Sequence, residues 1–524
     1  MPRPAPPQPP LTLGESRTLH HKLTKQSAVT LVELPPTQFG ILDGERSHDV
    51  YSQFRLPARA LHVLEGVLRA NGWQNVQSII PALHGKKGRL TGENHRRIRA
   101  SDVLGISAIL RTTPQSLELA RRYKLANPKG VVIAGGVAPT FSIPEWLGVV
   151  DVVVRGEGER TLLELMSRLE RSETLDDLDG VAFKRGEEIV VTKPRGLLSV
   201  EELSNLPHPH YDERTRARVN IGAMELSRGC PHDCSFCCVT QFYGRKYRIK
   251  SVDYAVEEWK RAEGLGRRMF FVDDNIFGDP RRSIQLLEAI ADSGRKRVAS
   301  CIQLPVNAAQ NPLFLDALRR AGVRFVAVGI DSIVDETLTA FGKTANARQT
   351  REAVRTFREA GFWVLGMMMI GGDGDTPEAM AETSEWINEN VDGAELFAPT
   401  PYLGTRFHDE LQAQGRILTE DLSLYDGQHV VFRPRHFTPL QLQETIDRMY
   451  QSFYSPARVL RRLTKGPHTA FDHRMSTLLI HGYVIVKGLR TVLHGAQSMA
   501  HLEFLKSVSS QRRDTVTQAV PALQ

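Results

Sequence analysis

The stretch Gly222-Ala-Met-Glu-Leu-Ser-Arg-Gly-Cys-Pro-His-Asp-Cys-Ser-Phe-Cys237 joins a short apolar run to three closely spaced cysteines. Residues 222–227 predict a buried strand, and the glycine before the first cysteine predicts a turn. Cys230, Cys234 and Cys237 are therefore expected on a loop at the carboxyl end of a strand, where α/β proteins place their chemistry. Three thiolates are enough to hold three irons of a four-iron cluster, which leaves the fourth iron open to a substrate.

Three other uses of these cysteines compete with an iron–sulfur cluster. A zinc site needs a fourth ligand, for which His232 or Cys238 is at hand, but the chain has no second C-x2-C pair. A disulfide framework is typical of small secreted domains, whereas this chain has 524 residues and five cysteines. Chance spacing is the weakest alternative, because four of the five cysteines fall between residues 230 and 238.

Length and composition set wider bounds. A chain of 524 residues predicts about three domains, and 41% hydrophobic with 24% charged residues is ordinary for a globular protein. The net charge of +7 is small for this length, and the basic-aromatic stretch 241–248 is too short to predict a nucleic-acid partner. Since no apolar run has the length of a membrane span, the sequence predicts no transmembrane segment and a cytoplasmic location.

Residues 27–184 alternate between strand and helix patterns. The expected strands are 28–33, 76–80, 103–107, 130–136 and 151–154, and the expected helices are 58–71, 115–126 and one from residue 160. Repeated βα units with nearly continuous apolar strands predict a doubly wound parallel sheet. Glycines at strand ends, such as Gly135 and Gly136, let a ligand approach the backbone closely.

A second series of strands is expected between residues 221 and 405. Its members are 222–227, 268–272, 297–302, 325–330, 363–370 and 395–398. Each strand is followed by polar or glycine residues, and such ends form the site face of a barrel.

The cysteine motif, with the aromatic Phe236 before its last cysteine, resembles the C-x3-C-x-aromatic-C signature of the radical S-adenosylmethionine (SAM) superfamily. The resemblance implies a 4Fe–4S cluster on the three cysteines and a partial (β/α)6 barrel made of the six strands. Only Cys238 and Cys301 lie outside the triad, so a second cluster with four cysteine ligands cannot be built from this chain.

SAM carries an amino group and ribose hydroxyls that need hydrogen-bond acceptors. The family binds the SAM amino group at the end of its second strand, where this chain has Asp273-Asp274-Asn275. The resemblance implies SAM contacts from Phe236, Asp273, Asp274, Asn275, Gln303 and Asp331. The alternative for one of these aspartates is a helix cap ahead of Pro280. Lys343 is similar to a lysine common in the subfamily, and its alternative is a solvated surface lysine.

The N-terminal region resembles the cobalamin-binding domain that precedes many radical SAM cores. The matching residues, which the resemblance implies as cobalamin contacts, are Ser107, Gly135, Gly136 and Glu157. The family's D-x-H-x-x-G motif, whose histidine ligates cobalt, is missing after the first strand, because residues 34–40 contain no histidine. The alternative is a domain that keeps this fold and binds no cofactor or holds substrate.

The rest of the chain divides by composition. Residues 1–26 are expected to be a disordered tail, 185–220 a linker, 406–510 a mostly helical C-terminal extension, and 511–524 a disordered tail. Helices are expected at 439–463 and 477–493. The second of these is amphipathic, and contact with a membrane surface or a lipid substrate is the alternative to core packing.

The sequence thus predicts an α/β fold: an N-terminal doubly wound, Rossmann-like parallel sheet, a partial (β/α)6 barrel and a helical extension. The implied enzyme cleaves SAM reductively to a 5′-deoxyadenosyl radical, for cobalamin-dependent methylation of an unactivated carbon. Its cofactors are a 4Fe–4S cluster, SAM and cobalamin, and its partners are a small-molecule or lipid-like substrate and an external electron donor such as flavodoxin or ferredoxin. Two alternatives stay open: a radical SAM enzyme without cobalamin that performs rearrangement, cyclisation or oxidation, and a zinc-binding non-redox protein. No catalytic residue is assigned.

Overall fold

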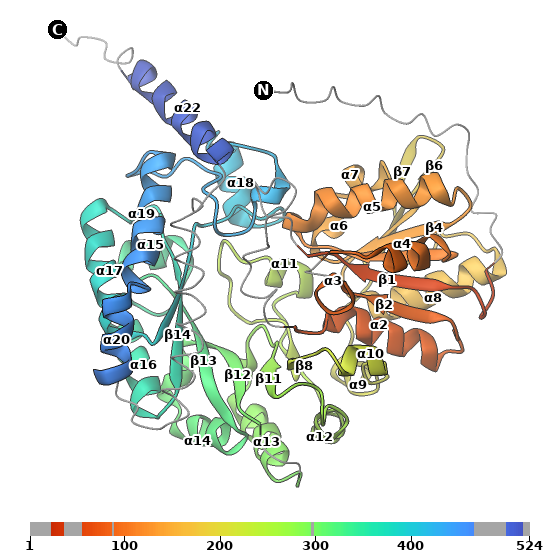
Figure 1. Ribbon diagram of the computed structural model, residues 1–524, viewed down its shortest axis with the longest axis horizontal. Coiled ribbons are helices and arrows are strands. Elements are labelled where there is room, and N and C mark those ends of the chain that lie inside the picture. The colour runs from red at the N-terminus through yellow and green to blue at the C-terminus, as the bar shows by residue number, and fades with distance from the viewer. Residues whose placement is uncertain (1–22, 36–54, 86–88, 295–297, 466–498, 517–524) are drawn as a thin grey trace.

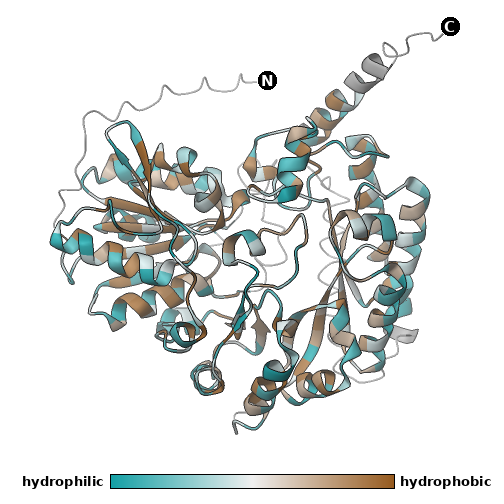
Figure 2. Cartoon of the chain, turned by 180° about the vertical axis from the view of Figure 1, so that it is seen from behind, coloured by the Kyte–Doolittle hydropathy of each residue, from teal (hydrophilic) through white to brown (hydrophobic). Residues whose placement is uncertain are grey.

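The computed structural model describes residues 23–35, 55–85, 89–294, 298–465 and 499–516. Two α/β units lie side by side, one built on a seven-stranded sheet and the other on a six-stranded sheet (Figure 1). The strands of both units are largely apolar, and the helices around them turn polar faces outward (Figure 2). The predicted fold class is confirmed.

The N-terminal sheet has the strand order β2-β1-β3-β4-β5-β6-β7, and β1 to β5 are parallel. Its strands are β1 (Val29–Glu33), β2 (Val76–Ile79), β3 (Val103–Ser107), β4 (Val131–Gly135), β5 (Val152–Val154), β6 (Val181–Arg185) and β7 (Glu188–Val191). The helices are α2 (Arg59–Ala70), α3 (Pro81–His84), α4 (Gly92–Arg99), α5 (Thr113–Ala126), α6 (Val137–Phe141), α7 (Ile143–Leu147) and α8 (Gly158–Arg171), with the 3-10 turn η1 (Leu110–Thr112). Because the sheet packs between helices, β3, β4 and β5 are buried along nearly their whole length.

The edges of this unit differ from the expected ones. The antiparallel hairpin β6–β7 carries the sheet to Val191, beyond the expected domain end at residue 184. Leu23 is fully buried in the core, so the packed structure begins inside the expected tail. The expected linker contains two short helices, α9 (Val200–Ser204) and α10 (Glu213–Arg216).

The second sheet has the order β15-β14-β13-β12-β11-β8, and all its pairings are parallel. Its strands are β8 (Ile221–Met224), β11 (Arg268–Phe271), β12 (Ser300–Pro305), β13 (Val323–Asp331), β14 (Trp363–Met369) and β15 (Gly393–Phe397). The connecting helices are α12 (Val252–Arg261), α13 (Pro280–Ala291), α14 (Pro312–Arg320), α15 (Asp335–Ala340), α16 (Ala347–Glu359) and α17 (Pro377–Asn390). Caps explain where three of these begin, since Asp279, Asn311 and Thr376 each accept a first-turn backbone N–H.

Side chains alternate between the two faces of the barrel strands. One set joins the hydrophobic core under the helices: Met269, Phe271, Ile302, Leu304, Val326, Val328, Val364, Met368 and Leu396. The alternating set is only partly buried and faces the inside of the open barrel: Phe270, Cys301, Gln303, Phe325, Leu365, Met367, Glu395 and Phe397. The inner face is therefore mostly apolar and aromatic.

The C-terminal extension consists of α18 (Arg406–Ala413), the 3-10 turn η4 (Leu422–Leu424), α19 (Pro439–Phe453), α20 (Pro456–Lys465) and α22 (Met499–Val516). The single helix expected at 439–463 was wrong: Pro456 lacks a backbone N–H and disfavours a helical conformation in the residue before it, so α19 ends and α20 begins. The helix expected at 477–493 lies outside the described residues. Within the described part of the chain, no helix has the length and hydropathy needed to span a membrane.

The extension also covers the open edge of the barrel. Tyr454 Oη accepts the backbone N–H of Ala394 at 3.2 Å and donates to its carbonyl at 2.7 Å, and Tyr450 Oη accepts the N–H of Leu396 at 2.9 Å. The N–H of Ala398 donates to the Gly427 carbonyl at 2.7 Å. These contacts satisfy backbone groups of β15 that a further strand would otherwise pair with.

A buried network of charged side chains joins the two units. The N-terminal unit supplies Arg59, Glu157 and Glu159, and the barrel side supplies Glu225, Arg228, Arg248, Lys250 and Glu258. Glu157 accepts from Arg228 at 3.1 Å, from Arg248 at 2.9 Å and from the backbone N–H of Leu198 at 2.7 Å. Burial alone would raise the pKa of Glu225, but Arg228, Lys250 and Arg59 hold it well below its usual range. The four cations are thus compensated by four carboxylates.

We expect Glu157→Gln to lower the free energy of unfolding by about 3–5 kcal/mol, because two buried guanidinium groups would lose their shared counter-charge. Glu202→Gln is the matched control, since its Arg160 ion pair is half-exposed and its capping bond to Ser199 can be kept by glutamine. It should cost less than about 1 kcal/mol. Urea unfolding of both variants measures the difference. Equal losses of stability would contradict a stabilising role of the buried ion pairs of Glu157.

Candidate functional site

The cysteine loop leaves the barrel through a short antiparallel pair. After β8, β9 (Ser227–Arg228) pairs with β10 (Arg248–Ile249), and α11 (Val239–Tyr243) follows the last cysteine. Gly229 has φ of +82°, and a Cβ there would lie 2.6 Å from the Lys246 carbonyl oxygen. Only glycine fits this turn, because it has no Cβ and adopts a positive φ without strain. The turn directs the chain from β9 into the cysteine loop.

The three thiols of the loop lie near one another in a partly buried position. Burial raises the pKa of Cys237 to about 12, with smaller effects from Cys238, Cys234 and Cys230, and burial likewise raises the pKa of Cys234. Among the described residues, no three His, Cys, Asp or Glu side chains converge to hold a single metal ion. A four-iron cluster does not require such convergence, because each thiolate binds a different iron.

The run Asp273-Asp274-Asn275 contacts the cysteine loop one residue after another. Asp273 Oδ1 accepts the N–H groups of Leu226 and Ser227, and Asp274 Oδ2 accepts the N–H of Gly229 at 3.3 Å. Asn275 Nδ2 donates to Cys230 Sγ at 3.5 Å. Three successive side chains are therefore hydrogen-bonded to the end of the strand, the turn and the first cysteine.

The capping alternative for this run holds only in part. Asn275 Oδ1 accepts the N–H of Phe277 and so caps the 3-10 turn η2 (Ile276–Gly278), whereas Asp279 caps α13. Burial raises the pKa of Asp273 to about 7 and that of Asp274 to about 6. Asp273 Oδ2 is buried and has no hydrogen-bond partner within the described structure, so its environment is not accounted for by protein contacts alone.

Asp331, Lys343 and Phe236 gather on the far side of the loop. Asp331 follows a register shift at the end of β13 and has φ of +59°, which is strained for a non-glycine residue. Its carboxylate pairs with Lys343 Nζ, which also lies 5.8 Å from the Phe236 ring centre. Burial alone would lower the pKa of Lys343, but Asp331 and the neighbouring cysteines raise it. Lys343 is therefore not a solvated surface lysine.

Gln303 and the two cysteines outside the triad lie on β12 and at the start of α11. Gln303 lies on the inner face of β12, beside Ala327 of β13. Cys301 lies two residues before it on the same face, and Cys238 precedes α11 within electrostatic range of Asp274. Phe236 packs edge-on against Phe341, with the two ring centres 5.3 Å apart.

The carboxyl edge of the N-terminal sheet brings together the two loops that follow β3 and β4. Ser107 Oγ donates to Glu33 Oε2 at 3.3 Å, and burial raises the pKa of Glu33 to about 7. A Cβ on Gly136, whose φ is +99°, would lie 2.7 Å from the Ala108 carbonyl oxygen. Gly136 is thus required by the protein backbone, whereas a Cβ on Gly135 would meet only ordinary contacts at 3.6 Å or more.

The hydrogen bonds of Glu157 do not involve Gly135 or Gly136. Both of its carboxylate oxygens are engaged by Arg228, Arg248 and the Leu198 N–H. The structure therefore shows it as a link to the cysteine loop, and its predicted contact with cobalamin stays a prediction. Of residues 34–40, where a cobalt-ligating histidine was missing, only 34 and 35 are described.

The carboxyl edges of the two sheets face each other. A Cβ on Gly404, just after the barrel, would lie 2.4 Å from Phe141 of α6. Tyr402 lies within electrostatic range of Cys238 on the cysteine side and Arg111 on the N-terminal side. Leu422 and Leu424 of η4 join the hydrophobic cluster that contains Leu104 and Ile106 of β3. The N-terminal unit, the segment just after the barrel and the extension thus pack against one another here.

The sequence interpretation missed the residues that connect these sites. Arg228 sits within the quoted stretch, and Arg248 and Lys250 belong to the basic-aromatic stretch and its continuation. A detectable signal existed, since charged residues in short strands are buried only when paired. Their partners are distant in sequence and do not lie in strands, so the sequence does not single them out: Glu157, Glu159 and Glu258.

Two family models match the chain. The radical SAM superfamily model covers residues 224–387, and the B12 binding domain model covers residues 50–166. Both matches fall on the units that hold the corresponding candidate residues. Together these domains imply a 4Fe–4S cluster, SAM and cobalamin as cofactors, and the residues described above offer each of them a suitable donor set or an open backbone approach.

Individual relatives agree with this assignment. An uncharacterised methyltransferase of Pyrococcus horikoshii is 28% identical over 404 residues, covering 75% of this chain and 84% of the relative. The hopanoid C-3 methylase of Methylococcus capsulatus is 29% identical over 394 residues, covering 72% and 71%. These matches favour a cobalamin-dependent radical SAM methylase over both alternatives.

The fold has a solved counterpart. The cobalamin-dependent SAM radical enzyme OxsB, with aqua-cobalamin and SAM bound, matches with a TM-score of 0.64 at 14% identity, covering 92% of this chain and 83% of that chain. At this identity the likeness is one of fold, and it spans both units and the extension. The chain thus carries a domain of the radical SAM superfamily at residues 224–387, preceded by a B12-binding domain at residues 50–166.

Proposed function

We propose that this enzyme methylates an unactivated carbon of an apolar small molecule, using a 4Fe–4S cluster, SAM and cobalamin. The observation that carries the proposal is the facing arrangement of the two carboxyl edges, which the buried ion network holds together. A methyl donor on one edge and a radical source on the other can then reach the same substrate carbon. Proximity of this kind supplies much of the rate of a two-site reaction.

The residues of the cysteine loop have separate roles in this proposal. Cys230, Cys234 and Cys237 hold the cluster, and Asn275 donates a hydrogen bond to the first of these sulfurs. Asp273 and Asp274 fix the loop and leave acceptor oxygens near SAM. The remaining SAM contacts are assigned to Phe236, Gln303 and Asp331, with Lys343 holding Asp331 in place.

When bound, the cluster and SAM supply a 5′-deoxyadenosyl radical that removes a hydrogen atom, and cobalamin supplies the methyl group. The chain's own part is to bind, orient and exclude water. Phe236, Phe341 and Phe407 form a series of edge-on aromatic contacts beside the loop, which keeps solvent away from it. An electron from an external donor is needed for each reduction.

The inner face of the barrel supports an apolar substrate. Aromatic and aliphatic residues line it, including Phe270, Leu365, Met367 and Phe397, and its polar members are Cys301, Gln303 and Glu395. Such a lining gives an apolar molecule a favourable environment and offers charged molecules little. Two of the relatives are named hopanoid methylases, at C-3 and at C-2. A lipid-like substrate is therefore the class we favour.

The N-terminal edge is assigned to cobalamin. Ser107 and Gly135 lie where the ligand would meet the ends of β3 and β4, and Gly136 shapes the backbone beside them. We keep Glu157 as a residue that joins this edge to the cysteine loop. No histidine ligand to cobalt is assigned.

The function is tested by anaerobic incubation of reconstituted enzyme with reductant, SAM, cobalamin and a lipid extract containing candidate polycyclic substrates. We expect 5′-deoxyadenosine together with a product heavier by one methylene unit, detected by mass spectrometry. Omitting cobalamin should abolish the methylated product. Formation of 5′-deoxyadenosine with a rearranged or oxidised product and no need for cobalamin would contradict the methylase and support the first alternative.

Cys234→Ala should remove the cluster, because two thiolates cannot hold it. The expected result is loss of most iron and sulfide from the anaerobically purified protein, measured by chemical analysis. Cys301→Ala is the control for iron content, since that thiol lies on the inner face of β12 rather than on the loop. Zinc in place of iron in the unmodified protein would overturn the assignment of the triad.

Gly135→Ala should weaken cobalamin binding while leaving the fold intact. A methyl group there meets only ordinary protein contacts, so the free energy of unfolding should change by less than about 0.5 kcal/mol. If the ligand approaches this backbone, affinity should fall at least about tenfold in an absorbance titration. Gly136→Ala is the contrasting variant, because its strained backbone should lower stability by about 1–3 kcal/mol. Unchanged affinity in Gly135→Ala would contradict the assignment.

A further inference from the structure

The loop that carries the cysteine triad is flanked on its outer side by three exposed cations. Arg245 and Lys246 lie in the turn between α11 and β10, and Arg406 begins α18. The side chains of Arg245 and Arg406 are 61% and 51% exposed. We call these three residues the basic rim. The sequence alone marked 241–248 as a basic-aromatic stretch without a use.

Both parts of the basic rim are anchored directly to the cysteine loop. The Lys246 carbonyl packs against Gly229, the residue before Cys230. Arg406 Nη2 donates to the Asp233 carbonyl at 2.6 Å, and the next N–H, that of Phe407, donates to the Ser235 carbonyl at 3.0 Å. The rim therefore sits at a fixed position on the solvent side of the triad.

The charge of this surface is positive. Asp233 is the carboxylate of the loop itself, and both Arg245 and Arg406 lie near it, at 3.4 Å and 3.5 Å. Three cations thus share one acidic neighbour, although Asp409 and Glu410 follow further along α18. Exposed ion pairs of this kind add little stability, so their contribution to stability does not explain why Arg245 and Lys246 are placed here.

We infer that the basic rim is the docking surface for a small acidic electron-carrier protein of the flavodoxin or ferredoxin kind. This inference rests on the proposed function, which needs one electron from outside for each reduction. The electron leaves the reduced flavin or iron–sulfur centre of the carrier and reduces the cluster from the 2+ to the 1+ state, with no bond made or broken. The rate of electron transfer falls steeply with distance, and the rim is an exposed surface that adjoins the cluster ligands.

Electrostatic steering makes the surface testable. Opposite charges on two proteins raise the rate of encounter by 10-fold or more, and salt weakens this effect. A nucleic acid would also be attracted by cations, but the anchoring of both rim segments to the cysteine loop favours an electron carrier. A short single-stranded DNA probe separates the two partners.

The experiment uses full-length enzyme with its cluster and follows cluster reduction by absorbance in stopped flow. Reduced flavodoxin is compared with dithionite, and the readout is the ratio of the two rates. For Arg245→Glu with Lys246→Glu, and separately for Arg406→Gln, we expect the ratio to fall, about tenfold for the double variant. In the unmodified enzyme, added salt should lower the flavodoxin rate more than the dithionite rate.

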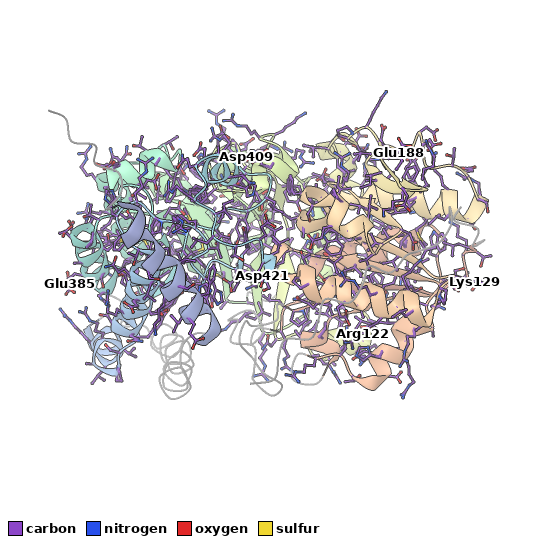
Figure 3. All side chains as sticks on the ribbon, turned by 90° about the horizontal axis from the view of Figure 1, so that it is seen from above. Arg122, Lys129, Glu188, Glu385, Asp409 and Asp421 are labelled. Atoms are coloured by element: carbon purple, nitrogen blue, oxygen red, sulfur yellow. The ribbon has the colours of Figure 1, made fainter. Side chains whose placement is uncertain are left out.

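The matched control is Arg122→Glu with Lys129→Glu, which makes the same change in net charge on the N-terminal unit. Figure 3 shows Arg122 and Lys129 there, well separated from Asp409 of α18. The control should keep the ratio of the unmodified enzyme. An unchanged ratio in the rim variants would overturn the inference, as would loss of DNA binding alone. Absence of any dithionite-reducible cluster would instead refute the proposed function.

Discussion

The buried ion network between the two units is the interaction on which the rest of this structure depends. Arg228 stands two residues before the first cysteine of the triad, and its guanidinium group reaches Glu157 and Glu159 of the other unit and Glu225 of its own. Charges taken out of water must be compensated, so burial strongly favours the arrangement of the units that pairs all eight groups. One set of contacts thereby fixes both the start of the cysteine loop and its position relative to the N-terminal sheet.

Hydrogen bonds from residues 273–275 fix the position of the cysteine loop from within the barrel as well. They hold the same loop at Ser227, Gly229 and Cys230, whereas Lys343, paired with Asp331, lies beside Cys234 and the Phe236 ring. Contacts on several sides restrict the geometry in which this loop presents its thiols. Preorganisation of this kind is what lets a protein direct the reactivity of a cofactor.

Much of this was predictable, and the reasons for the rest are physical. Strand positions such as 103–107 and 363–370 followed from apolar runs, and the triad with Phe236 indicated the family. The run Asp273-Asp274-Asn275 was predicted to bind SAM, and that stays a prediction. Its contacts to Gly229 and Cys230 could not be predicted, because they depend on β8 and β11 being neighbours. The break between α19 and α20 could have been predicted from Pro456, which the single helix expected at 439–463 contained in its interior. The structure shows where the candidate cofactor-binding residues lie, but their contacts with the cofactors remain predictions.

The sequence by itself determined the local chemistry: which strands are apolar, where glycine is required, and where three thiols lie close together on one loop. Those properties depend on neighbours within a few residues, so they can be read along the chain. Only the tertiary structure decided that Glu157 binds Arg228, that Tyr450 and Tyr454 cover the edge of β15, and that Arg406 lies beside the cysteine loop. These pairings join residues dozens to more than a hundred positions apart, and they arise because burying charged and polar groups is favourable only when the fold supplies each with its partner.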